Sequence, residues 1–194
     1  MGIFTEIRNE CLIKELQREL NTDVLLFGFD GMVYFGRLQK VEDCRVATLM
    51  APEEASNVEI QTPSGENVEV RFAHVDLWQI VAKATGVKTN PFDSGYGKGP
   101  AAGLPERTDT TERQESHELI CILRRMIGDE VAITTLGGFL FTGTLGDVDD
   151  ELAFISVDDI FIPGTSSQIS DDDVSTAVIN LEAITSVSLL NCTC

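Results

Sequence analysis

One segment of this chain occurs twice, and the repetition restricts the fold more than any other feature of the sequence. The stretch Leu12–Asp43 aligns without a gap with Leu119–Asp150, 107 positions later, and about ten of the 32 paired positions are identical. The identical pairs include Gly31 with Gly138, Gly36 with Gly143, Leu38 with Leu145 and Val41 with Val148. A self-match at one fixed offset indicates an internal duplication. We therefore expect two copies of one folding unit.

Each copy begins with apolar residues at the spacing of an amphipathic helix. These residues are Leu12, Ile13, Leu16 and Leu20 in the first copy, and Leu119, Ile120, Leu123 and Ile127 in the second. Ser116 is of a residue type that caps the start of a helix. Asn21 and Gly128 tolerate the left-handed backbone conformation that ends many helices. The sequence therefore predicts a short helix at the start of each copy.

A β-hairpin is expected after each helix. The candidate first strands are residues 24–29 and 131–136. They lead into Asp30-Gly31 and Gly137-Gly138, which supply the positive φ angles of a two-residue hairpin turn. The second strand is expected over residues 32–41 and 139–148. It bends where Gly36 or Gly143 stands, so that one strand can serve both sides of a small barrel.

Further strands complete each copy. The third strand is expected over 45–50 and 152–157, and the last strands within 68–81 and 176–190. In this prediction Val75 and Ile184 are matched, at an offset of 109. The predicted fold class is all-β with short N-terminal helices. It consists of two tandem SH3-like barrels of five strands, each preceded by an α-helix and each with its own core.

Domain boundaries follow from composition. Residues 84–115 are rich in glycine, proline, threonine and charge and carry neither a helical nor a strand period, which is typical of a flexible linker. This leaves a first barrel at 1–83 and a second at 116–194. Each barrel would lie near the lower size limit for independent stability.

The glycines and apolar positions of the repeat resemble the first sequence motif of the Sm-like (LSm) domain family. The second copy fits that motif at Gly138, Gly143, Leu145, Val148 and Asp149, and the first copy at Gly31, Gly36, Leu38 and Val41, with Glu42 in the acidic place. The resemblance implies a tandem of Sm-like barrels. It also implies a homo-oligomer built by pairing the edge strand of one barrel with that of the next, and an unprotected edge favours such pairing physically.

The chain departs from the Sm-like pattern at the residues that bind RNA in that family. Where an asparagine is expected, this chain has Ala153 in the second copy and Val46 or Ala47 in the first, and no Arg-Gly pair appears in the last strands. An apolar side chain cannot hydrogen-bond a base edge. We therefore expect the RNA pocket to be lost or altered.

Charge argues against nucleic acid in the second half. The chain has a net charge of −18, and from Leu119 onward its only basic residues are Arg124 and Arg125. Such a surface repels a phosphate backbone. The first half is more mixed, so an alternative hypothesis is an RNA-binding Sm-like protein. Its contacts would be Arg37, Lys40, Arg45 and Arg71.

A third hypothesis is a barrel that binds a small molecule or metal, using the polar loop at 164–175. The acidic clusters of the second copy lack the spacing of a calcium loop, and solvated corners are their default interpretation. His74 and His117 have no cysteine or carboxylate at metal-ligand spacing. We expect no metal and no cofactor.

No motif of a known catalytic site is present, and GYGKGPAAG at 95–103 lacks the strand and helix that a phosphate-binding loop needs. No apolar run approaches the roughly 20 residues of a membrane span. The odd count of 5 cysteines fits a reducing cytoplasm. The favoured hypothesis is a cytoplasmic, non-catalytic tandem Sm-like protein that acts by self-association and protein-protein contacts.

Overall fold

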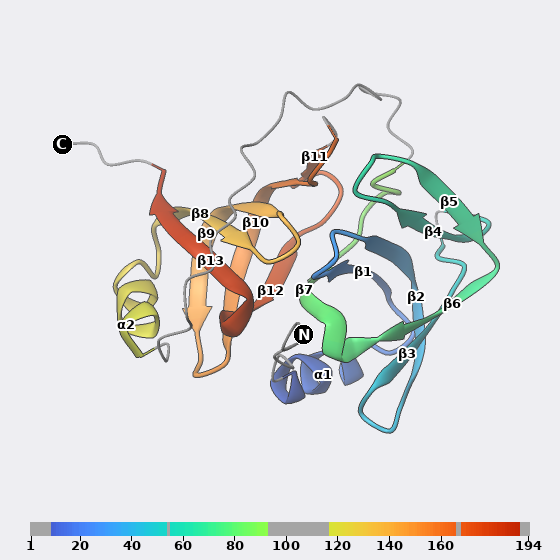
Figure 1. Ribbon diagram of the computed structural model, residues 1–194, viewed down its shortest axis with the longest axis horizontal. Coiled ribbons are helices and arrows are strands. Elements are labelled where there is room, and N and C mark those ends of the chain that lie inside the picture. Colours follow the sequence, from blue (N-terminus) through green and yellow to red (C-terminus); the bar gives the residue numbers. More distant parts are fainter. Residues whose placement is uncertain (1–8, 54, 93–116, 166–167, 191–194) are drawn as a thin grey trace, which may run out of the picture.

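The computed structural model describes residues 9–53, 55–92, 117–165 and 168–190, and within them the chain is mostly β-sheet (Figure 1). The first unit consists of α1 (Glu10–Gln17), β1 (Asp23–Gly28), β2 (Val33–Glu42), β3 (Val46–Met50), β4 (Val58–Gln61), β5 (Asn67–Val70), β6 (Phe72–Asp76), the 3-10 helix η1 (Leu77–Gln79) and β7 (Ile80–Thr85). The second unit consists of α2 (His117–Arg125), β8 (Glu130–Thr135), β9 (Leu140–Val148), β10 (Leu152–Phe161), β11 (Gln168–Ser170), β12 (Thr176–Asn180), the 3-10 helix η2 (Leu181–Ala183) and β13 (Ile184–Leu189). The all-β class is confirmed.

The two units share their first and last elements but differ between them. Among the described residues the first unit has seven strands and the second has six, so the prediction of five strands in each unit is wrong. α1, β1 and β2 each begin 107 residues before α2, β8 and β9. The last three elements, β6, η1 and β7, begin 104 residues before β12, η2 and β13. The expected match of Val75 with Ile184 is therefore wrong, and Ile184 corresponds to Ile80 instead. The cause is the 3-10 helix between the last two strands, which apolar alternation does not indicate.

Residues that follow the helices tie them to the second strand in the same way in both units. Asn21 and Gly128 have positive φ angles of 65° and 92°, as predicted. The N–H of Asn21 donates to the Leu38 carbonyl at 2.7 Å, and that of Gly128 donates to Leu145 at 2.8 Å. Both helices end earlier than expected, so Leu20 and Ile127 lie beyond them and are exposed. Ser116 lies outside the described residues.

Glycines shape the turns and bends of the hairpins. Gly31 and Gly138 have φ angles of 86° and 85°, so the predicted positive φ angles occur at these two glycines. The predicted two-residue turn is wrong. The backbone bonds Gly28 to Met32 and Thr135 to Phe139 each enclose a turn of three residues. Gly36 and Gly143 allow close approach of the third strand: an added Cβ at Gly143 would lie 1.9 Å from the Ser156 carbonyl oxygen. The pairing of β9 with β10 is irregular just beyond this position, so the strand bends here.

The strands form one open antiparallel sheet in the order β13-β8-β9-β10-β12-β7-β1-β2-β3-β6. The short strand β11 pairs with β10, and the hairpin of β4 and β5 pairs with β2. Strands β7 and β12 lie at the centre and join the two units (Figure 1).

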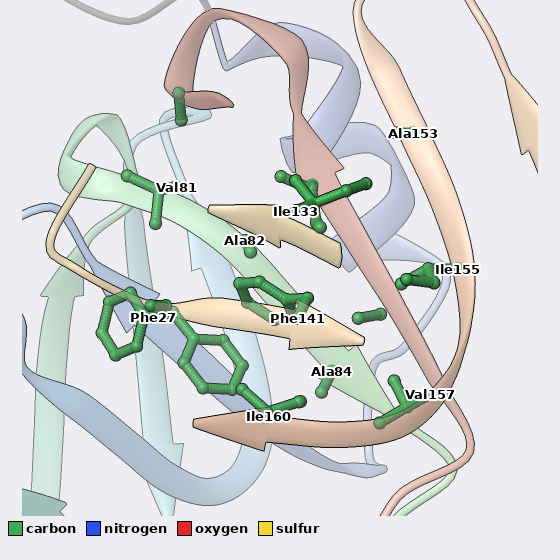
Figure 2. Packing of buried hydrophobic residues seen from close by; sticks show 14 of the residues in the cluster. Phe27, Val81, Ala82, Ala84, Ile133, Phe141, Ala153, Ile155, Val157 and Ile160 are labelled. Carbon is green, nitrogen blue, oxygen red and sulfur yellow. The ribbon is translucent and has the colours of Figure 1, made fainter. Parts of the chain in front are cut away.

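The core is shared between the units, so the expectation of a separate core for each copy is wrong. The ring of Phe27 in β1 lies 5.1 Å from that of Phe139 and 5.3 Å from that of Phe141, centroid to centroid. Figure 2 shows Phe27 beside Phe141 within this cluster. A second cluster adds Leu152 and Val178 to residues of the first unit. The pairing of β7 with β12 causes this, because it places apolar faces of both units side by side.

Residues 84–92 of the predicted linker are part of this joint structure. Ala84 and Thr85 belong to β7. The backbone N–H of Lys88 donates to the Asp173 carbonyl at 2.7 Å, and the Thr89 hydroxyl donates to the Asp173 carboxylate at 2.6 Å. The remaining linker residues, 93–115, lie outside the described part of the chain.

Candidate functional site

The contact between the two units is an antiparallel strand pairing, which we call the seam. Within it β7 pairs with β12, so that Thr85 lies opposite Thr176 and Lys83 opposite Val178. The seam therefore joins the last strand of one unit to the second-last strand of the other. This pairing lies within a single chain, and the expected edge-strand pairing between chains stays a prediction.

A buried amide pair connects α1 to the seam. Asn9 and Asn180 are 0% and 1% exposed. The Asn180 Nδ2 group donates to Asn9 Oδ1 at 2.6 Å, and Asn9 Nδ2 donates to the carbonyls of Leu77 at 2.5 Å and Ile80 at 2.9 Å. One polar network thus contacts α1, η1, β7 and β12.

A buried lysine lies beside this pair in the same strand pairing. Lys83 of β7 is 1% exposed, and its Nζ lies 3.6 Å from the Glu19 carboxylate. Burial lowers the pKa of Lys83, and the Glu19 and Glu15 carboxylates oppose that shift. Ion pairing by Glu19 therefore compensates for a lysine placed within an apolar strand.

A second polar contact joins α1 to the corner between β9 and β10. A hydrogen bond to Glu151 and then burial raise the pKa of the Cys11 thiol to about 11. The thiol therefore stays protonated at neutral pH and is a poor nucleophile. This contact is structural, and it adds to the attachment of α1 to the second unit.

Two strands at the ends of the sheet correspond to the two strands of the seam. Strand β6 is the counterpart of β12 and pairs only with β3 among the described strands. Strand β13 is the counterpart of β7 and pairs only with β8 in the same described region. Both strands also carry exposed apolar side chains, since Phe72 is 52% exposed and Leu189 is 39% exposed.

Most residues of the predicted fold motif serve the packing of the units. Leu38, Leu145 and Val148 are buried, and Val41 is half-buried against the cluster that contains Leu38. Asp149 is exposed, and its backbone N–H donates to the Leu152 carbonyl at 2.9 Å. The apolar residues therefore pack in the core, and Asp149 stabilises the turn between β9 and β10.

The candidate nucleic-acid contacts of the first unit are largely neutralised by carboxylates. Arg37 lies 2.9 Å from Asp23 and 3.1 Å from Glu53. The Lys40 ammonium lies 2.7 Å from Glu42, and the Arg45 guanidinium lies 3.2 Å from Asp76. Arg71 is exposed between β5 and β6. The positions expected to bind a base also offer no polar side chain, since Ala47 and Ala153 are buried.

The other polar candidates also have local explanations. His74 is exposed, and its Nδ1 lies 3.1 Å from the Thr48 hydroxyl. Burial, and then the charges of Asp158 and Asp171, raise the pKa of Asp159. Among the described residues, no group of three or more histidine, cysteine, aspartate or glutamate side chains could hold a metal ion. No described helix has both the length and the hydropathy needed to cross a membrane.

Sequence reasoning missed the polar residues of the seam. One available signal was the alignment of Asp76-Leu77 with Asn180-Leu181, which places the two last strands at the offset of 104. A second was Lys83, a single charge in an otherwise apolar strand. Neither signal identifies the partner residues, Asn9 and Glu19, which flank α1.

No protein-family model matches this chain, and no curated protein matches it.

Proposed function

We propose that this chain is a non-catalytic tandem Sm-like protein that acts through self-association and protein-protein contacts, with each unit forming a small barrel. One observation carries the proposal. The chain contains one completed seam, and the two end strands of its sheet, β6 and β13, are counterparts of the two seam strands, each paired along one edge only among the described strands. A second chain can therefore offer β13 to the free edge of β6. Such head-to-tail contacts close into a ring or continue as a filament.

The seam supplies a register for the contact between chains. When the offset of 104 is applied to the pairing of Thr176 with Thr85, Phe72 lies opposite Leu189 of the next chain. Both side chains are exposed in the single chain and would be covered in the assembly. Burial of such apolar area stabilises association.

Two features support an RNA pocket that is lost or altered. The basic side chains of β2 and of the turn before β3 are paired with acids. A buried alanine occupies the expected asparagine position in the second unit. We therefore favour a function through protein contacts along the sheet edges over a function through nucleic-acid binding.

The first prediction concerns charge at the two edges. The double variant Phe72→Glu/Leu189→Glu would place like charges opposite each other, and we expect it to weaken association by about tenfold or more. The double variant Phe72→Lys/Leu189→Glu changes the same positions but places opposite charges together, so it should associate more tightly than the first. Native mass across a concentration series, by light scattering or native mass spectrometry, measures both.

Ile127→Glu is the surface control, because Ile127 is 43% exposed and belongs to neither β6 nor β13. It should leave the assembled mass unchanged. A wild-type mass of one chain at every micromolar concentration tested would contradict the proposal. Equal association of the two double variants would contradict the register.

A second prediction separates this function from RNA binding. We expect no binding of short U-rich or A-rich RNA at low salt, because most candidate basic side chains are already paired with carboxylates. Fluorescence anisotropy at low and high salt is the measurement. Binding that weakens steeply with salt, and that Arg71→Ala reduces, would favour the RNA-binding alternative.

A further inference from the structure

Backbone groups next to the buried pair fix the orientation of both side-chain amides, Asn9 and Asn180. The carbonyls of Leu77 and Ile80 only accept hydrogen bonds, so Asn9 directs its Nδ2 toward them and its Oδ1 toward Asn180. The backbone N–H of Glu182 only donates, and it bonds to Asn180 Oδ1 at 2.9 Å. The residue at position 180 must therefore accept at one atom and donate at the other.

Asn9 makes this contact instead of capping the helix α1. It is the residue before α1, where an asparagine side chain commonly caps the helix. Here its side chain makes no capping hydrogen bond and points to η1 and β12 instead. If no donor lay opposite the buried Asn9 Oδ1, that oxygen would have no hydrogen bond, and the folded state would be destabilised.

The counterpart of Asn180 in the first unit is Asp76, which lacks the donor. Asp76 also begins a 3-10 helix, and its Oδ1 accepts from the Trp78 N–H at 3.1 Å. If β6 of a second chain docked on β7 as β12 does, its carboxylate would face Asn9 Oδ1. Two acceptors in a buried site repel each other, so that docking would be strongly disfavoured.

We propose that the Asn9–Asn180 pair selects the strand that docks on β7: it admits β12 and rejects β6. The free β6 edge is then left for β13 of another chain, a consequence that rests on the proposed function. The selection itself concerns only the seam within one chain.

The direct test is Asn180→Asp in the full chain, at a dilution where the native mass is that of one chain. This change keeps the acceptor for the Glu182 N–H and replaces the donor by a carboxylate oxygen, which accepts and carries charge at pH 7. At pH 7 we expect the melting temperature to fall by about 10 °C. Hydrogen exchange should become faster in β7 and β12. The outcome does not depend on association, so it is distinguishable from failure of the proposed function.

The pH dependence of that loss tests the donor specifically. A buried carboxyl at position 180 has a pKa above its unfolded value, so its destabilising effect is absent when it is protonated and grows as pH rises through the folded pKa. The protonated carboxyl can also donate to Asn9. Ionisable groups on the neighbouring elements are present in both proteins, namely Lys83 with its partner Glu19, Cys11, Glu151 and Glu182. A difference from wild type that is zero, or equal at pH 4 and pH 7, would overturn the proposal.

Strand selection is tested in the Leu189→Glu background, where β13 is blocked. Adding Asn180→Asp alone should leave single chains. Adding Asn180→Asp together with Asp76→Asn should produce association that depends on concentration, because β6 now offers an amide to Asn9 of another chain. Asp76→Asn alone should leave the melting temperature unchanged, since it removes only an exposed ion pair with Arg45. Equal masses for the two combined variants would overturn the selection.

Discussion

Phe27→Ala is expected to lower the free energy of unfolding by about 3 to 5 kcal/mol and to destabilise both units together. The ring is fully buried and contacts Phe139 and Phe141 of the other unit. Urea unfolding measures the loss by circular dichroism for the whole chain and by fluorescence of Trp78, the only tryptophan, for the first unit. The two signals should give one coincident transition.

The reciprocal change tests the shared core from the other side. Phe139→Ala lies in the second unit, yet it should lower the midpoint reported by Trp78 in the first. Phe72→Ala is the control, because that ring is exposed, and it should change stability by no more than about 0.5 kcal/mol in the single chain. Two separate transitions, with the Trp78 midpoint unchanged in Phe139→Ala, would mean that each unit has an independent core.

Gly143→Ala is expected to be strongly destabilising, because an added methyl group has no room between β9 and β10. The new Cβ would lie 1.9 Å from the Ser156 carbonyl oxygen and 3.0 Å from the Asp158 backbone nitrogen, and Gly143 has a φ of 152°. Both neighbours are backbone atoms of β10, so the strands would have to separate. We expect a loss of at least about 3 kcal/mol in the free energy of unfolding.

Gly146→Ala is the matched control, because it adds the same methyl group to the same strand. Its nearest neighbour would be the Phe154 carbonyl oxygen at 3.6 Å, an ordinary contact distance. It should change stability by less than about 1 kcal/mol. Thermal unfolding by circular dichroism compares the two variants, and equal melting temperatures would show that β9 and β10 do not need the close approach at Gly143.

Local chemistry made the first half of each unit predictable. Asn21 and Gly128 indicated the ends of the helical regions, and Gly31 and Gly138 indicated the hairpin turns, because few residue types adopt positive φ angles at low cost. The same local geometry places a backbone hydrogen bond in both copies, from Asn21 to the Leu38 carbonyl and from Gly128 to the Leu145 carbonyl.

Segments with weaker local signals were not predicted. Strand β4 and the short strand β11 lie in stretches that read as polar loops, since Glu59 and Gln61 interrupt the apolar pattern of β4. Strand β5 falls mostly within 68–81, where the last strands were expected, but it pairs with β4. In the structure Glu59 is buried because its carboxylate accepts from the amides of Asn67 and Asn90, at 3.0 Å and 2.7 Å. Partners outside the strand therefore allow a polar residue inside it.

The sequence by itself determined that one unit of helix and bent strands occurs twice, because repetition, glycine positions and period are properties of neighbouring residues. Only the tertiary structure decided that β7 pairs with β12 and that the two units share a core. The apolar periodicity of a strand or helix indicates that one of its faces is buried, but it does not indicate which other element packs against that face. The polar residues of the seam illustrate this: Asn180 is explained by Asn9, 171 residues away in the chain, and no local pattern connects the two.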